Sequence, residues 1–226
     1  MFSPLPIALV LASMGFVAAD DAPSASEEGF VPLFDGKTFQ GWEDRHGPFR
    51  IKDGAIGGGD LNQPTKESEF LCTTKEFTDF ELRLKFKAVP TKTEEVNGGI
   101  QFRSKRAPEG SAVIGYQADI GVIPSYAPYK FWGCIYDDSR RNRVIAGDGA
   151  ANEKFVKKGD WNDYVIRCEG KRIRLWLNGH QTVDYTEPDA SIPQTGIIAL
   201  QLHSGPPQEV WYKDICIKVH STGAKP

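Results

Sequence analysis

Three strand-like stretches of the sequence carry polar residues at alternate positions. They span residues 100–103, 116–120 and 200–203. Successive side chains of a β-strand point to opposite faces, so the polar residues of each stretch share a face and the apolar residues between them turn toward a core. If the three strands lie in one sheet, its polar face carries six side chains: Gln101, Arg103, Gln117, Asp119, Gln201 and His203.

These residue types suit the binding and conversion of a sugar. The His203 imidazole can accept a proton near neutral pH, and Asp119 can orient it, bind a hydroxyl or act as the base itself. Arg103 can stabilise a developing oxyanion, because its charge is permanent and its donors lie in one plane. Each glutamine offers a donor and an acceptor together, as sugar hydroxyls require. We therefore predict His203, Asp119 and Arg103 as catalytic residues and the glutamines as substrate-binding residues.

Structural explanations compete with this one. The outer face of any antiparallel sheet alternates in the same way, His203 can be a structural or merely exposed histidine, and Arg103 can pair with Asp119 across the sheet. Ordinary outer faces are usually built from Lys, Glu and Thr, as in the stretch 80–87. Gln, Asp and His are poor strand formers, so their presence favours a binding role.

Aromatic residues supply candidates for a platform on which a sugar ring stacks, although aromatics in strands more often belong to the core. Trp132 and Tyr136 are predicted to bind substrate, as is Arg141 in the segment 136–141, which can fold over the polar face as a rim. That segment can equally be a calcium-binding or plain surface loop. Tyr126, Tyr129 and Trp211 are further platform candidates.

Several catalytic signatures are missing from the sequence. It has no glycine-rich phosphate loop, no Gly-x-Ser-x-Gly elbow and no His-Glu-x-x-His motif. Glycosidases usually need two carboxylates about 5–10 Å apart. The polar strand 116–120 supplies only Asp119 beside the Gln117 amide, which argues against the ordinary two-carboxylate mechanism.

The period of the sequence is two almost throughout, and about a dozen short strands are separated by Gly- and Pro-rich clusters such as 57–60 and 97–99. Asn178-Gly179 between two apolar runs predicts a tight hairpin. No segment of twelve or more residues has helical spacing. We expect an all-β jelly-roll sandwich of two antiparallel sheets over residues 29–220, with a long loop at 137–155.

The chain ends and the charge limit the location and the partners. Residues 1–19 are predicted to be a signal peptide cleaved after Ala19, residues 20–28 a disordered spacer and residues 221–226 a flexible tail. The apolar run in 1–19 is too short for a comfortable membrane span. The net charge of −3 gives no electrostatic case for nucleic acid. We therefore expect an exported protein, periplasmic or secreted.

Four cysteines lie in strand-like runs: Cys72, Cys134, Cys168 and Cys216. Export permits disulfides, yet buried free thiols are also common in such runs, and both explanations remain open. No Cys-x-x-Cys spacing indicates a zinc site.

The stretch 31–42, VPLFDGKTFQGW, resembles the LFDGKTLxGW opening of the 3-keto-disaccharide hydrolase domain family. Six later segments follow in the family's order: 49–56, 97–104, 115–120, 159–164, 176–179 and 196–204. The resemblance therefore extends over about residues 30–219, almost the whole mature chain. The resemblance implies a concanavalin-like jelly roll related to family 16 glycoside hydrolases, and export in many bacterial members. Many relatives have Glu where this sequence has Gln117.

The resemblance also implies a reaction that needs no carboxylate pair. A ketone at C3 of an oxidised sugar acidifies the C2 hydrogen, a single base removes it, and the C1 substituent leaves by elimination, after which water can add. His203 or Asp119 would be the base, with Arg103 and Gln117 stabilising the enolate. A divalent cation held by His203 and Asp119 is conceivable. The alternative to an enzyme is a carbohydrate-binding module without catalysis, and a structural or adhesion domain is a third hypothesis.

Overall fold

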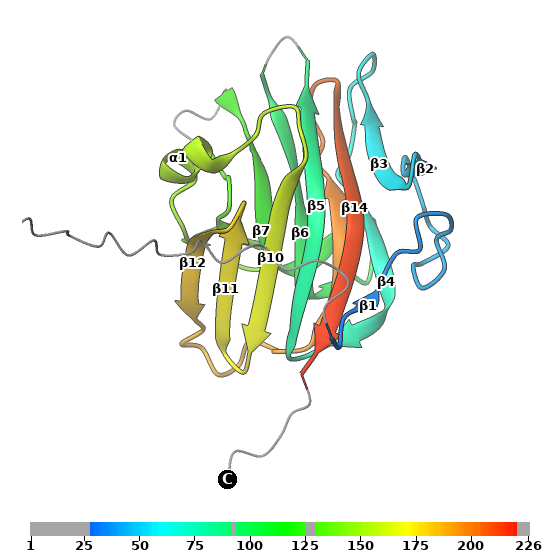
Figure 1. Cartoon of the computed structure of the whole chain (residues 1–226). Coiled ribbons are helices and arrows are strands. Elements are labelled where there is room, and N and C mark those ends of the chain that lie inside the picture. The colour runs from blue at the N-terminus through cyan, green and yellow to red at the C-terminus, as the bar shows by residue number, and fades with distance from the viewer. Residues whose placement is uncertain (1–27, 92–93, 125–129, 221–226) are drawn as a thin grey trace, which may run out of the picture.

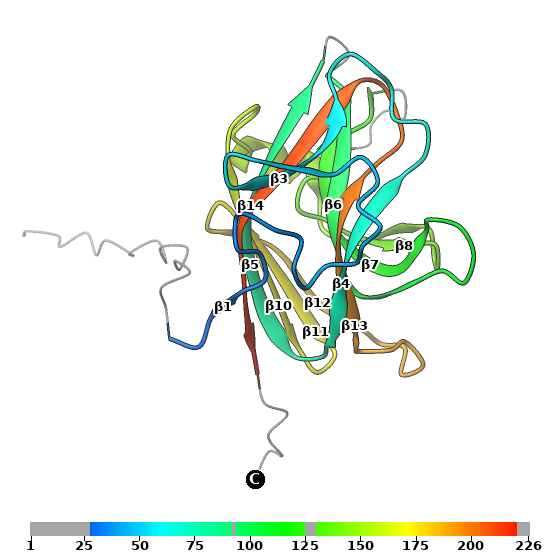
Figure 2. The ribbon, with the colours of Figure 1, turned by 90° about the vertical axis from the view of Figure 1, so that its right-hand side faces the viewer.

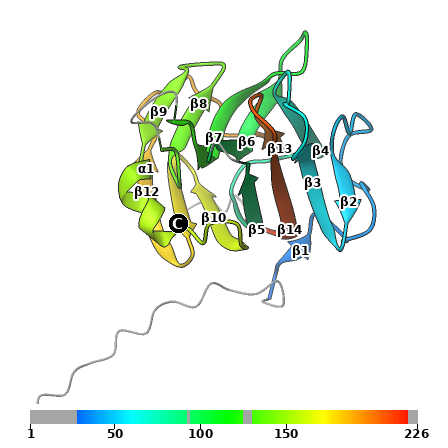
Figure 3. The same cartoon turned by 90° about the horizontal axis from the view of Figure 1, so that it is seen from above.

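The computed structural model describes residues 28–91, 94–124 and 130–220. These residues form two antiparallel sheets packed face to face, as the end-on view in Figure 3 shows. The two-sheet, all-β prediction is confirmed. The predicted signal peptide and tail lie outside the described residues, as do the spacer up to residue 27, Tyr126 and Tyr129.

The larger sheet has eight strands and faces the viewer in Figure 1. Its order is β12 (His180–Thr186), β11 (Arg172–Leu177), β10 (Asn162–Glu169), β5 (Phe80–Pro90), β14 (Gln208–Val219), β3 (Ala55–Asp60) and β2 (Arg50–Lys52), and β1 (Val31–Pro32) pairs with β14.

The smaller sheet has six strands and lies behind the first in that view, and Figure 2 shows the two layers from the side. Its order is β4 (Glu69–Phe77), β13 (Gly196–Leu202), β6 (Val96–Arg106), β7 (Val113–Val122), β8 (Ile135–Asp138) and β9 (Arg143–Ala146). The helix α1 (Gly149–Asn152) and the 3₁₀ turn η2 (Glu153–Phe155) follow β9.

The core fills the space between the sheets, and the period of two explains it. Leu82 and Phe86 of β5 point inward, while the charged residues between them point outward. From the other sheet, Ile100, Phe102 and Leu200 pack into the same core. The apolar half of each predicted polar strand therefore lies where the alternation requires.

Two details of the predicted layout are corrected. The glycine clusters expected to separate strands lie inside β3 and β6, at positions where neighbouring side chains or backbone carbonyls leave no room for a Cβ. The expected loop at 137–155 contains β9, α1 and η2. The Asn178-Gly179 hairpin is confirmed, since both residues adopt the positive φ angles of such a turn between β11 and β12.

All four cysteines are buried and present as free thiols: Cys72, Cys134, Cys168 and Cys216. Burial raises the pKa of the Cys72 thiol to about 12, with a smaller contribution from the Glu43 carboxylate. Such thiols are held in the uncharged, unreactive form. In the part of the chain that the structure describes, no helix has the length and hydropathy to span a bilayer.

Candidate functional site

A polar pocket of about 290 Å³ opens on the outer face of the six-stranded sheet, away from the core. It is lined by Asn97, Gln117, Asp119, Ile123, Phe131, Tyr136, Asp138, Gln201 and His203. Of the predicted site residues, Gln117, Asp119, Tyr136, Gln201 and His203 are thus brought together, from β7, β8, β13 and the residue after β13.

Strand register explains this convergence. β6 lies between β7 and β13, and its Gly99 is opposite both Asp119 of β7 and Gln201 of β13. One step along the same face, Gln101 is opposite Gln117. The polar residues of three strands distant in sequence therefore form two adjacent rows on one face.

Gly99 makes room for the centre of the site. A Cβ at this position would lie 2.6–2.7 Å from side-chain atoms of Gln117, closer than real Cβ contacts allow. The Gln117 side chain lies over the Gly99 backbone, and from there it reaches Asp119 and Gln201. A glycine is required here by close approach, since the backbone of Gly99 is not in the left-handed region.

The amides form one directed hydrogen-bond network. Ser104 Oγ donates to Gln101 Oε1 at 3.0 Å, and Gln101 Nε2 donates to Gln117 Oε1 at 2.8 Å and to Asp138 Oδ2 at 2.9 Å. Gln117 Nε2 in turn donates to Asp119 Oδ1 and, at 3.0 Å, to Gln201 Oε1. The amide hydrogens of Gln101 and Gln117 are thus committed to the protein, and Gln101 is completely buried.

Two carboxyl groups border the pocket where the sequence indicated one. Burial raises the pKa of Asp119 well above its usual range, the nearby Asp138 charge raises it further, and the hydrogen bond from Gln117 opposes the shift. Burial also raises the pKa of Asp138, against the opposing effects of hydrogen bonding and of His203. Asp119 therefore favours the protonated form, in which a carboxyl group donates a proton.

The imidazole of His203 is held by the backbone. Its Nδ1 lies 2.6 Å from the carbonyl oxygen of Ser204. A carbonyl only accepts, so Nδ1 carries the hydrogen of this bond, and the neutral ring keeps its lone pair on Nε2. His203 is only half-buried and lines the pocket, so a base is available at its edge.

Asn97 has an unused acceptor at the same pocket. Its side chain is 8% exposed, and its Oδ1 is buried without a hydrogen-bond partner. A buried acceptor without a partner costs about 1–3 kcal/mol. A ligand hydroxyl in the pocket can supply the missing hydrogen bond.

The prediction that Arg103 shares the face of Gln101 is wrong. Arg103 has a φ of 47°, and the pairing register of β6 shifts between Phe102 and Lys105. This β-bulge breaks the strict alternation. The buried guanidinium instead donates to Thr78 O and Gly170 O and pairs with Asp79 at 2.9 Å, which ties together the β4–β5 and β10–β11 turns.

Four other predicted residues also lie outside the pocket lining. Gln101, predicted to bind substrate, is completely buried beneath it. Trp132 is 3% exposed and belongs to the core. Arg141 is committed to ion pairs with the buried carboxylates Asp137 and Glu187, away from the pocket lining. Trp211, a platform candidate, lies on β14 of the other sheet.

The sequence did not single out Asn97 or Asp138 as site residues. Asn97 precedes two glycines, a pattern typical of a turn. Asp138 comes just before Arg140 and Arg141, so its sequence context indicates a surface ion pair. The available signal for Asn97 was its position, two residues before Gly99 and four before Gln101 on one face of the strand.

Among residues 28–91, 94–124 and 130–220, no group of three or more His, Cys, Asp or Glu side chains is arranged to hold a metal ion. The pocket carboxyls are instead engaged by glutamine amides.

Comparison with known families identifies the whole domain. The family model described as the 3-keto-alpha-glucoside-1,2-lyase-like domain matches residues 29–218. The chain belongs to this family. Among curated proteins, none matches the sequence.

Solved structures show the same concanavalin-like fold. A protein from Parabacteroides distasonis, provisionally designated a glycosyl hydrolase, superposes with a TM-score of 0.65 at 19% identity, over 86% of this chain and 95% of that one. The carbohydrate-binding module CBM66 from Bacillus subtilis gives a TM-score of 0.58 at 15% identity, over 79% and 95%. The lumenal domain of VIP36 gives 0.60 at 13% identity, over 88% and 91%. At these identities the likeness shows the fold alone.

Proposed function

We propose that this protein is an exported enzyme that cleaves glycosides already oxidised at C3 of the sugar, by removal of the C2 proton and elimination of the C1 substituent. Family membership supports the substrate class. The observation that carries the proposal is the meeting, on one small pocket, of a half-buried imidazole, a buried carboxyl group whose pKa is raised by burial, and an unused acceptor.

His203 is the base in this proposal. Its Nδ1 hydrogen is fixed on Ser204, so Nε2 faces the reaction with its lone pair. When Nε2 takes the C2 proton, the C–H electrons form the C2=C3 bond and the ketone becomes an enolate. Gln201 Nε2 makes no hydrogen bond within the described part of the chain, so it supplies an amide donor for the enolate oxygen in place of the predicted Arg103.

Asp119 is the acid. When the enolate collapses, the C3 carbonyl re-forms, a C1=C2 bond forms, and the bond from C1 to the leaving oxygen breaks. The Asp119 carboxyl donates its proton to that oxygen, which leaves as an alcohol. The proton taken by His203 then returns to Asp119 through water. Addition of water across C1=C2 gives net hydrolysis. Asn97 Oδ1 accepts a hydrogen bond from a sugar hydroxyl and orients the ring.

The test is turnover of a 4-nitrophenyl 3-keto-glucoside beside the unoxidised glucoside, combined with exchange of the C2 hydrogen in D₂O. His203→Ala should lower nitrophenol release about 10²–10⁴-fold and abolish C2 exchange. Asp119→Asn should slow release and retain exchange, because it removes the acid and keeps the base. His180→Ala, at an exposed histidine outside the pocket, is the matched control.

The contrary outcomes separate the alternatives. Cleavage of the unoxidised glucoside at a similar rate would replace the proposal with a two-carboxylate glycosidase using Asp119 and Asp138. Cleavage of neither compound, together with binding of the sugar, would indicate a carbohydrate-binding module. The fold likeness to such a module and the closed amide network support that second candidate.

A further inference from the structure

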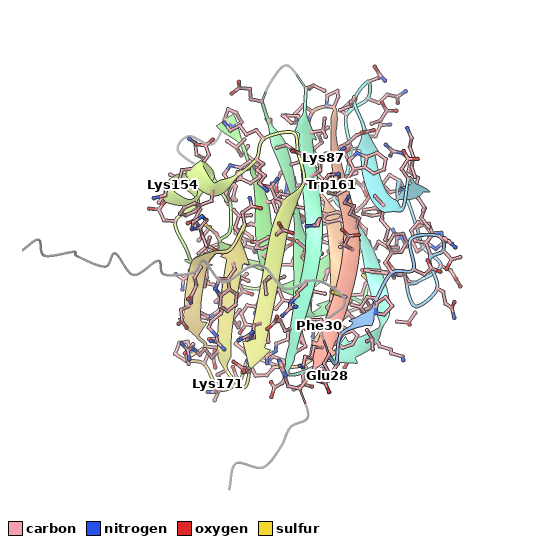
Figure 4. All side chains as sticks on the ribbon, viewed as in Figure 1. Glu28, Phe30, Lys87, Lys154, Trp161 and Lys171 are labelled. Atoms are coloured by element: carbon pink, nitrogen blue, oxygen red, sulfur yellow. The ribbon has the colours of Figure 1, made fainter. Side chains whose placement is uncertain are left out.

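A second set of sugar-binding residue types lies on the opposite side of the molecule, on the outer face of the eight-stranded sheet. The register places Lys87 of β5 opposite Trp211 of β14, Trp211 opposite Gly57 of β3, and Gly57 opposite Arg50 of β2. Trp161, which directly precedes β10, lies beside Lys87, as Figure 4 shows, and adds a fifth strand position to the row. With strands about 4.8 Å apart, this row of aromatic and cationic side chains is about 19 Å long.

Two lysines carry uncompensated charge here: Lys87 of the row, and Lys213, which lies two residues after Trp211 on β14. The Nζ atoms of Lys87 and Lys213 lie 5.1 and 4.4 Å from the centre of the partly exposed Trp161 ring. Neither lysine forms an ion pair among the described residues. The neighbouring carboxylate of Asp163 is already engaged by Lys85. Two positive charges therefore flank one indole on a protein whose net charge is −3.

Trp211 is held flat in the same row. A Cβ on Gly57 would lie 2.4 Å from the Trp211 ring, so the indole rests directly over the glycine backbone. Its Nε1 donates to Glu209 Oε2 at 2.9 Å, and the Arg50 guanidinium stacks 4.7 Å from the ring centre. Glu209 also forms an ion pair with Arg50, so the two charges compensate each other. This indole is thus fixed in orientation before any ligand binds.

From these contacts we infer that the row from Trp161 to Arg50 is a surface binding site for an anionic polysaccharide. Trp161 and Trp211 are two strand spacings apart, about 10 Å, so one chain can place the apolar face of a sugar ring on the Trp161 indole and its next units over the stacked Arg50 and Trp211. Lys87 and Lys213 bind its carboxylate or sulfate groups. The site would hold a polymer by one face while the pocket on the other sheet is left accessible.

The test compares carboxymethylcellulose with hydroxyethylcellulose, two soluble polymers on one backbone of which only the first is charged. In affinity electrophoresis of the full chain at low salt, carboxymethylcellulose should retard the protein and hydroxyethylcellulose should do so much less. The double variant K87Q/K213Q should weaken the retardation about tenfold, and added salt should weaken it in the wild type. Trp161→Phe, which keeps a ring of smaller area, should weaken it to a lesser extent.

Two control variants make the result specific. Lys171→Gln removes an exposed lysine from the distant β10–β11 turn, visible in Figure 4, and should bind as the wild type does. His203→Ala should also bind normally, because the pocket is on the other sheet, so failure of the proposed reaction leaves this test intact. Absence of retardation by carboxymethylcellulose, or equal retardation of K87Q/K213Q and the wild type, would overturn the inference.

Discussion

The outer faces of the two sheets have the same alternating pattern, but the polar side chains compared below lie in different environments. On the eight-stranded sheet, Lys85 pairs with Asp163 and Arg50 with Glu209, and these side chains remain partly exposed. On the six-stranded sheet, Gln101 and Gln117 are 0% and 3% exposed and are joined by direct hydrogen bonds. Both sets of side chains point away from the core, but only the second is removed from water.

The difference shows what a polar face needs in order to be buried. Charged side chains keep most of their hydration at an exposed face, so their pairing adds little stability. Amides can be buried when every donor and acceptor has a partner, and Gln101 and Gln117 meet that requirement. A carboxyl group in the same place, such as Asp119, responds to burial by a rise in its pKa.

The largest expected difference is in the free energy of unfolding lost when a buried or an exposed carboxylate is removed, and Glu187 provides the buried case. This completely buried carboxylate accepts from Arg141 and from Tyr116 at 2.7 Å. Glu187→Ala should lower the free energy of unfolding by about 3–5 kcal/mol, because it leaves the Arg141 charge short of a partner. Glu209→Ala, on the exposed face, should cost about 1 kcal/mol or less. Urea denaturation at neutral pH measures both.

Glu187 also has a pH signature. Burial alone would raise its pKa, but hydrogen bonds from Arg141 and Tyr116 outweigh burial and hold the pKa at about 2, below the ordinary 4.5. Its stabilising contribution should be complete above about pH 4.5 and disappear as the pH falls toward 2. Equal losses for Glu187→Ala and Glu209→Ala would show that the two environments do not differ as described.

The second difference is between two glycines that lie beneath side chains. Gly99→Ala pushes against Gln117, which three hydrogen bonds hold in place, so it should cost about 1–3 kcal/mol and disturb the pocket. Gly57→Ala pushes against the partly exposed Trp211, which one hydrogen bond and the Arg50 stack hold in place instead of three buried hydrogen bonds, and should cost less. Thermal and urea unfolding compare them, and a larger loss for Gly57→Ala would contradict the prediction.

The smallest expected effect is the pH dependence caused by Asp119. Because its pKa is raised in the folded protein, the folded state binds more protons than the unfolded state above about pH 4, so stability falls as the pH rises through that window. One such group contributes a slope of up to about 1.4 kcal/mol per pH unit. Asp119→Asn should make the slope shallower, with Asp138 supplying the remainder.

Stability curves at several pH values measure this slope, and Asp163→Asn on the exposed face is the matched control. An unchanged slope in Asp119→Asn would mean that Asp119 is ionised in the folded protein. It would then be unable to act as the acid in the proposed reaction.

Most of the fold could be predicted from the sequence because it depends on a local period. Alternation of apolar and polar residues determined the strands, the inward set of each strand and the two-sheet class. It also placed Gln117, Asp119, Gln201 and His203 on a common face, because no bulge interrupts the alternation between Gln117 and Asp119 or between Gln201 and His203. The Asn178-Gly179 hairpin was equally local, because the two residues by themselves favour the required φ angles.

The sequence by itself therefore determined which side chains point away from the core, and the tertiary structure decided which contacts those side chains make. The alternation predicted Arg103 on the same face as Gln101, but a bulge in β6 directs its side chain to an ion pair with Asp79. Bulges depend on pairing with neighbouring strands, which the alternation does not show. Asp138 and Asn97 joined the pocket only through register between β8, β7, β6 and β13. Such contacts link residues far apart in the chain, and burial, which sets the pKa of Asp119, exists only once those contacts have formed.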